Sequence, residues 1–257
     1  MPRIHVAERA GVGPDGGPRP SEDHVAVLPN AVVLLDGATA AHPALPSGGW
    51  YAGLLRRWLT AALHTAPESD LAELLASAIA GVAADHDLHP GDSPSSTVAI
   101  LRWTADRVDA LVLADSPVVV FGPRGYEVLA DDRIAVLRRT GLLRTAADVR
   151  ERRNAEGGFW VAEADPTAAA HARRASWPRA DLTAALLASD GVAVGVDDYG
   201  LLDWPGVLDL ARTRGPDAVL DAVRLAEHGD PHGVRWPRVK RHDDQTLALV
   251  EFGAATG

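Results

Sequence analysis

The sequence predicts an α+β protein built on antiparallel β-sheet, with helices packed against it. Two short apolar runs, 24–28 and 31–35, are separated by a two-residue turn and predict a β-hairpin. Further apolar runs follow one another between residues 98 and 129 and predict an antiparallel meander. Between these two regions, the segments 50–64 and 71–87 have the apolar periodicity of helices that pack on a sheet.

Composition narrows the class of protein. The 257 residues suit one large domain or two small ones, and no linker or repeat divides them, so we expect a single domain over 1–257. The absence of cysteine excludes a disulfide framework, a thiolate metal site and a cysteine nucleophile.

Charge and hydropathy also restrict the partners. A net charge of −10 argues against nucleic acid or an anionic membrane as a binding partner. No apolar run reaches the roughly 18–20 residues that a bilayer requires. Segment 1–11 lacks the apolar core of a signal peptide. We therefore expect a cytoplasmic monomer that binds neither nucleic acid nor membrane.

Two apolar runs end in the same dipeptide. The run 31–35 leads directly into Asp36-Gly37, and the run within 182–191 ends in Asp190-Gly191. Asp-Gly is a common turn dipeptide, which explains either pair alone. An acid at the end of a buried strand is costly unless its charge is compensated, and two such strand ends can converge on one cation.

Further acids occupy similar places. Glu22 and Asp23 begin the strand before Asp36, so an antiparallel hairpin makes these three carboxylates neighbours. Asp243 precedes the last predicted strand, 247–252. Carboxylate and carbonyl oxygens are the ligands that Mg²⁺ and Mn²⁺ select, whereas zinc would recruit histidine or cysteine, and no histidine pair has suitable spacing. Two such ions about 3.5–4 Å apart can bridge a water and hold a phosphoryl group for in-line attack, without a covalent intermediate.

Six short motifs, each weak alone, occur in an order that covers nearly the whole chain. They are SED (21–23), VVLLDGAT (32–39), SST (95–97), LADSP (113–117), LLASDG (186–191) and DDQT (243–246). The series resembles the bacterial branch of the PPM-type, phosphatase 2C-like metal-dependent serine/threonine protein phosphatases. The resemblance implies a four-layer α-β-β-α sandwich, in which helices flank two central antiparallel sheets and the metals occupy a cleft at one edge.

The resemblance also implies roles for the strand-end acids. Asp36 resembles the ligand that bridges two Mg²⁺ or Mn²⁺ ions, and Gly37 resembles the residue that offers its backbone carbonyl. Asp190 and Asp243 match the acids on the first metal. Asp36 and Asp190 are therefore also the expected catalytic acids.

The second and third metals have matching positions as well. Glu22 and Asp23 correspond to the acidic pair near the second metal, partly through water. Asp132 is placed like the acid that holds a third, weaker metal, with Asp131 as the alternative. Thr246 completes the DDxT signature.

The sequence departs from the family pattern at three places. Arg19 lies three residues before Glu22 where the family has its phosphate-binding arginine about four before; Arg3, another arginine or a merely solvated Arg19 are the alternatives. Ala114 replaces a glycine before Asp115, which we expect to orient water or a ligand without binding metal directly. Ala38 stands where some members carry a histidine proposed as general acid, so leaving-group protonation would fall to metal-bound water.

The resemblance thus predicts a phosphoserine/phosphothreonine protein phosphatase that acts on a phosphorylated protein, with a cognate Ser/Thr kinase. Two alternatives remain: a pseudophosphatase or binding module on the same fold, and a phosphatase for a small-molecule phosphate ester. Segment 140–180 matches the family poorly and leaves room for the latter.

Overall fold

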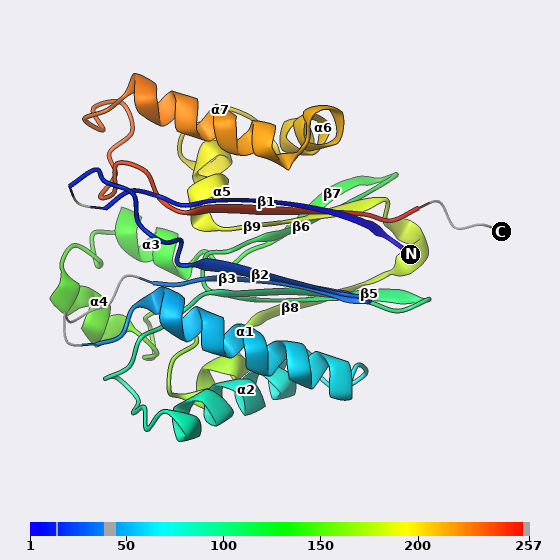
Figure 1. Ribbon diagram of the computed structural model, residues 1–257, viewed down its shortest axis with the longest axis horizontal. Coiled ribbons are helices and arrows are strands. Elements are labelled where there is room, and N and C mark those ends of the chain that lie inside the picture. Colours follow the sequence, from blue (N-terminus) through cyan, green and yellow to red (C-terminus); the bar gives the residue numbers. More distant parts are fainter. Residues whose placement is uncertain (14, 39–44, 254–257) are drawn as a thin grey trace.

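The computed structural model describes residues 1–13, 15–38 and 45–253. Two five-stranded antiparallel sheets face each other, and helices cover their outer surfaces (Figure 1). The predicted four-layer α-β-β-α sandwich is therefore confirmed. Thr39 of the second motif and half of the loop that follows it lie outside the described residues.

Each sheet combines strands from distant parts of the chain. The first sheet contains, in spatial order, β1 (Arg3–Arg9), β10 (Gln245–Glu251), β9 (Ala184–Ala188), β6 (Val118–Gly122) and β7 (Gly125–Leu129). The second contains β2 (Asp23–Leu28), β3 (Ala31–Asp36), β4 (Val98–Trp103), β5 (Arg107–Leu113) and β8 (Arg173–Pro178).

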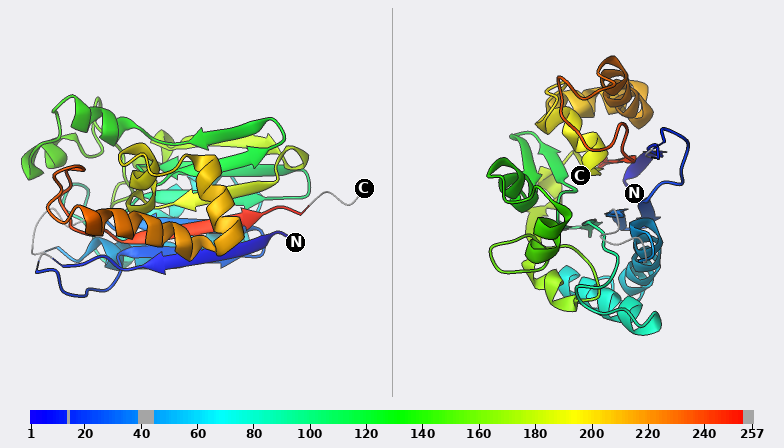
Figure 2. Two further views of the ribbon diagram at one scale, coloured as in Figure 1. Left: turned by 90° about the horizontal axis from the view of Figure 1, so that it is seen from above. Right: turned by 90° about the vertical axis from the view of Figure 1, so that its left-hand side faces the viewer.

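The helices divide between the two outer layers and one end. The second sheet is covered by α1 (Gly48–Thr65) and α2 (Leu71–Asp85). The first sheet is covered by α5 (Asp190–Asp197), α6 (Trp204–Arg214) and α7 (Pro216–Gly229). Two short helices, α3 (Arg133–Arg139) and α4 (Ala146–Arg152), lie at the end of the sandwich opposite the N-terminus (Figure 2). In the described ranges, none of the helices combines the length and apolar character needed to cross a bilayer.

Strand β3 shows why the central apolar run has no polar position. Val33 and Leu35 pack against α1 and α2, whereas Val32 and Leu34 pack against the other sheet. All four side chains are fully buried. A strand covered on both faces must be apolar throughout, so the pattern changes only where the strand ends, at Asp36.

The prediction of one continuous meander was wrong, because its four strands belong to two different sheets. Strands β4 and β5 pair in the second sheet, and β6 and β7 pair in the first. The chain crosses between them at Ala114, whose positive φ of 68° turns the backbone away from its former direction. The short runs of these strands carry no signal of which sheet they join, so periodicity alone could not separate them.

The region after the meander contains little regular structure. Between residues 140 and 154 the only helix is α4, and Gly141 with φ of 73° turns the chain before it. A 3-10 helix, Pro166–His171, follows Asp165 and leads into the edge strand β8. Strand β8 is largely exposed and arginine-rich, which hides it from an apolar pattern.

A matched pair of truncations tests the core between the sheets. Leu101 is 0% exposed there, whereas Leu225 on α7 is 73% exposed. We expect Leu101→Ala to lower the free energy of unfolding by about 2–5 kcal/mol, measured by urea denaturation. Leu225→Ala should change it by less than about 0.5 kcal/mol, and equal losses in the two variants would contradict this packing.

Candidate functional site

The β2–β3 hairpin gathers the first acids. Its register places Asp23 directly opposite Asp36, and Glu22 comes just before Asp23. The Gly37 amide donates a hydrogen bond of 3.1 Å to the Glu22 carbonyl. The three carboxylates that the sequence placed together by hairpin pairing are therefore neighbours in the structure.

Hydroxyl side chains from two of the sequence motifs hold the backbone of Asp36 in place. The Asp36 amide donates to the Thr97 hydroxyl at 3.1 Å, and the Ser96 hydroxyl donates to the Asp36 carbonyl at 3.0 Å. Thr97 in turn shares a 2.6 Å hydrogen bond with Ser116. The motifs SST and LADSP thus converge on this strand end and hold its backbone.

Helix α1 packs closely beside the hairpin because glycines occupy the contact. A Cβ on Gly37 would clash with the backbone of Gly48 and Gly49, so only glycine permits this contact. The Gly49 amide donates to a Glu22 carboxylate oxygen at 3.4 Å. The positive end of the α1 dipole therefore faces the acidic pair.

The other two strand-end acids come from the first sheet. Ser189 and Thr246 exchange hydrogen bonds of 3.0 and 2.9 Å, which join the end of β9 to the start of β10. Asp190 follows Ser189 directly. A Cβ on Gly191 would clash with the Asp244 carbonyl, so the Asp-Gly corner requires its glycine.

Asp244 connects the two sheets at this edge. Its carboxylate accepts hydrogen bonds from the Gly11 amide at 2.7 Å, the Glu22 amide at 3.2 Å and the Arg19 guanidinium at 2.5 Å. The side chain is 3% exposed. Asp244 had no expected role beyond the DDQT motif, yet it draws the hairpin acids toward β10.

The acids share one electrostatic environment. Burial raises the pKa of Asp36 well above its ordinary value, and the charges of Asp23, Asp190, Asp243 and Asp115 raise it further. Burial likewise raises the pKa of Asp190 to about 7, with Asp115 as the largest charged contributor. Five aspartates from both sheets therefore influence one another across this edge.

Asp23 is the most deeply buried of these acids. Among the described residues, neither of its carboxylate oxygens has a hydrogen bond of good geometry, and burial raises its pKa to about 7 although the nearby side chains of Ser189, Thr246 and Asp36 lower it. A buried carboxylate in this condition is costly unless it is protonated or faces a cation. The oxygen-rich set fits Mg²⁺ or Mn²⁺ by donor chemistry. In the part of the chain that is described, however, no three acidic or histidine side chains are already gathered into a cage for an ion.

Two basic side chains enter the acidic cluster. Arg19 lies 3.1 Å from Glu22 and 3.7 Å from Asp243, in addition to its bond with Asp244. The Lys240 ammonium lies 2.6 Å from Asp243. Arg3, the alternative to Arg19, is opposite Glu251 at the far end of β1.

The acids near α3 occupy different environments. Asp132 is exposed at the start of α3, without a capping hydrogen bond from its side chain. Asp131 is buried, accepts a 2.7 Å hydrogen bond from Arg133, and raises the pKa of Asp115 through its charge. Asp131 thus lies nearer the cluster than Asp132, while the assignment of a third ion stays a prediction.

Asp115 also belongs to the interacting acids, since its charge raises the pKa of both Asp36 and Asp190. It comes shortly after an apolar strand, as Asp190 does. Its expected role, to orient water or a ligand, stays a prediction. Removal from water raises the pKa of Asp115, as it does for Asp36 and Asp190.

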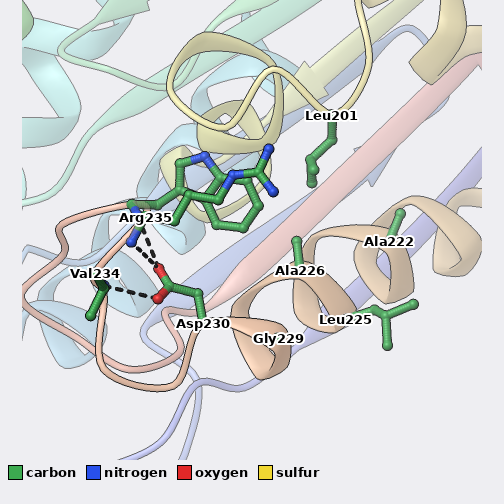
Figure 3. Close-up of a pocket in the computed structure, with 9 residues that line it drawn as sticks. Leu201, Ala222, Leu225, Ala226, Gly229, Asp230, Val234 and Arg235 are labelled. Atoms are coloured by element: carbon green, nitrogen blue, oxygen red, sulfur yellow. Dashed lines mark hydrogen bonds between the residues drawn. The ribbon is translucent and has the colours of Figure 1, made fainter.

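A separate hollow of about 620 Å³ lies against α7 (Figure 3). Its lining is mostly apolar and includes Leu201, Leu225 and Trp236. Asp230 at its edge accepts hydrogen bonds of 2.8 and 3.1 Å from the amides of Val234 and Arg235 (Figure 3). None of the acids of the cluster lines this hollow. Its lining includes the first residues of the loop that carries Lys240.

Solved structures share this fold across nearly their whole length. The catalytic domain of the serine/threonine protein phosphatase PstP, in complex with two manganese ions, superposes with a TM-score of 0.62 at 17% identity, over 97% of each chain. The PPM Ser-Thr phosphatase MsPP from Mycobacterium smegmatis, in complex with cacodylate, gives 0.61 at 18% identity over 98% of each chain. Stp1 from Staphylococcus aureus gives 0.62 at 15% identity, over 98% of this chain and 95% of its own.

No family model and no curated protein matches the sequence. The TM-scores show a common fold. At these low sequence identities, the activity of this chain has to be argued from its own residues.

The raised pKa values predict how stability depends on pH when metal is removed. Asp23 and Asp190 have pKa values of about 7 in the folded protein against an ordinary value of 3.8, so the folded state binds more protons than the unfolded state between these values. The free energy of unfolding in EDTA should therefore fall as pH rises from about 4 to about 7. Asp190→Asn should show a shallower fall in urea denaturation. An identical pH dependence in wild type and variant would contradict the shared environment.

The Gly191 corner can be tested with a matched glycine. Gly191→Ala should lower the free energy of unfolding by about 1–3 kcal/mol, because its Cβ would displace the Asp244 carbonyl. Gly229, the last residue of α7, has open space around a built Cβ. Gly229→Ala should be neutral or slightly stabilising, by up to about 1 kcal/mol. Thermal or urea denaturation measures both variants, and a neutral Gly191→Ala would refute the close approach.

Proposed function

We propose that this protein is a Mg²⁺- or Mn²⁺-dependent phosphatase for phosphoserine and phosphothreonine in proteins. The observation that carries the proposal is the cluster of interacting aspartates at one edge of the sandwich. The cluster includes Asp23, whose buried carboxylate has no hydrogen bond of good geometry among the described residues. The same fold occurs in serine/threonine phosphatases, one of which binds two manganese ions.

The proposal gives each acid a distinct part. Asp36 and the Gly37 carbonyl would face both ions from the end of β3, while Asp190 and Asp243 would face one ion from the first sheet. Asp23 and Glu22 would serve the other, from the start of the hairpin. When bound, the ions would supply the Lewis acidity that activates a water and polarises a phosphomonoester.

The remaining polar groups hold and orient the substrate. Arg19 would face the phosphate from a guanidinium already positioned by Asp244 and Glu22. Asp115 lies among the acids and would orient water or a ligand there, as the sequence predicts. Ala38 provides no acid for the leaving group, so a water molecule at the centre would have to supply the proton, as expected from the sequence.

One observation favours a second candidate function, that of a pseudophosphatase or binding module. Lys240 and Arg19 already neutralise part of the cluster, and the described acids do not form a ready cage for an ion. Such a protein would keep the sandwich and bind a phosphorylated partner without turnover.

A hydrolysis assay separates these functions. We expect wild type to release phosphate from p-nitrophenyl phosphate and from a phosphothreonine peptide with Mn²⁺ or Mg²⁺, and not with EDTA. Asp190→Asn should lose at least about 100-fold of this activity, because it removes a charged ligand. Asp198→Asn, an exposed acid at the end of the same helix α5, should retain full activity.

Each other outcome of the assay points to a different candidate function or refutes the centre. Phosphopeptide binding without release, in protein that binds Mn²⁺ by calorimetry, would favour the binding module. Faster hydrolysis of nucleotides or sugar phosphates than of phosphopeptides would favour a small-molecule phosphatase. Absence of both Mn²⁺ binding and hydrolysis would refute the proposed centre.

A further inference from the structure

Lys240 is the only lysine of the chain, and it lies three residues before Asp243. Its ammonium contacts Asp243 Oδ1 at 2.6 Å, and its side chain is 31% exposed. Burial lowers the pKa of Lys240, but the charges of Asp243, Asp36 and Asp190 together raise it, so these three carboxylates lie within electrostatic range of the ammonium. This cation therefore stands inside the proposed metal centre.

Asp243 Oδ1, the oxygen that Lys240 contacts, has other polar neighbours. Asp243 Oδ1 also accepts the Asp244 amide at 2.9 Å, and the Arg19 guanidinium lies 3.7 Å away. A divalent cation that binds Asp243 must compete with the ammonium for the same negative charge. Binding of the ion would remove most of the attraction that holds Lys240 in place.

The backbone around Lys240 is held on both sides. Before it, Arg238 forms an ion pair of 3.3 Å with Asp230 and donates to the Glu227 carbonyl at 3.1 Å. After it, the buried His242 ring contacts Glu227 at 2.6 Å. The loop is thus anchored to the end of α7. A released Lys240 can only turn its flexible four-carbon side chain, so the ammonium stays near the cluster.

Arg19 and Lys240 differ in what would remain when a cation takes Asp243. Arg19 keeps its contact with the buried carboxylate of Asp244, which is assigned to neither ion. Lys240 loses the carboxylate that it contacts and becomes available to another anion at the same place. A substrate phosphate bound at the centre supplies that anion, with two negative charges and several acceptor oxygens.

We propose that Lys240 is a phosphate-positioning residue that divalent metal releases from Asp243. Without metal it neutralises Asp243; with metal it contacts the phosphoryl group of the substrate. This inference rests on the proposed function, because it requires metal and phosphate at the same centre. It distinguishes Lys240 from Arg241, the neighbouring basic residue, which is exposed.

Calorimetry tests both parts of the proposal, the competition with metal and the contact with phosphate. It is carried out with Mn²⁺ alone, and then with inorganic phosphate added to the Mn²⁺-loaded protein. Lys240→Met should bind Mn²⁺ about twofold to fivefold more tightly, since no ammonium has to be displaced. It should bind phosphate about tenfold more weakly, through loss of a charge-assisted hydrogen bond. Arg241→Met removes the same charge from the same loop and should change neither affinity by more than about twofold.

Kinetics and a conservative variant exclude a merely structural effect. Lys240→Met should raise KM for p-nitrophenyl phosphate more than it lowers kcat, and Lys240→Arg should restore most of the phosphate affinity. Tighter Mn²⁺ binding with unchanged phosphate affinity would overturn the positioning role. Unchanged Mn²⁺ affinity would overturn the competition. Absence of Mn²⁺ binding in wild type and Arg241→Met alike would instead refute the proposed function itself.

Discussion

Mutual repulsion among buried carboxylates is the constraint on which this structure depends. Asp23 and Asp36 meet because β2 and β3 pair in one register, and Asp190 and Asp243 meet because the end of β9 pairs with the start of β10. Each acid is costly in a partly dehydrated place, and each raises the cost of the others. The fold tolerates this arrangement because hydrogen bonds that involve Ser96, Thr97, Ser189 and Thr246 hold the strand ends, and because apolar cores between the layers stabilise the sandwich.

The same constraint explains the basic residues at this edge. Arg19 and Lys240 compensate part of the negative charge from opposite segments of the chain, one before β2 and one before β10. Asp244 holds Arg19 firmly through a buried carboxylate, whereas Lys240 has a single ionic partner among the described residues. Divalent cations would replace this compensation more completely, and the two basic side chains would then face an anionic ligand. Metal binding and phosphate binding are therefore expected to depend on each other.

Much of this arrangement could be predicted from the sequence. The pairing of Asp23 with Asp36 followed from a hairpin with a two-residue turn, and the sandwich followed from the family resemblance that the six motifs carry. The sheet assignment did not, because the apolar runs of β5 and β6 carry no signal of sheet membership and the left-handed turn at Ala114 sends the chain from one sheet to the other. Strand β8 was missed because an exposed edge strand has no apolar alternation to detect.

The finer contacts of the site were beyond sequence reasoning for a different physical reason. The bonds of Asp244 with Gly11 and Arg19 join segments more than two hundred residues apart in the chain, so no local spacing reports them. The sequence places Asp115 after an apolar strand, but its electrostatic interaction with Asp36 and Asp190 depends on the packing of the two sheets. The contact of Lys240 with Asp243 is local, yet a lysine three residues from an acid is ordinary without the surrounding cluster.

Anomalous diffraction at the manganese edge, from crystals grown with Mn²⁺, tests the central claim most directly. The account predicts at least two anomalous peaks among Asp36, Asp190 and Asp243, with the Lys240 ammonium moved away from Asp243. Crystals without such peaks, in which Lys240 still contacts Asp243 at saturating Mn²⁺, would show that these carboxylates do not form a metal centre.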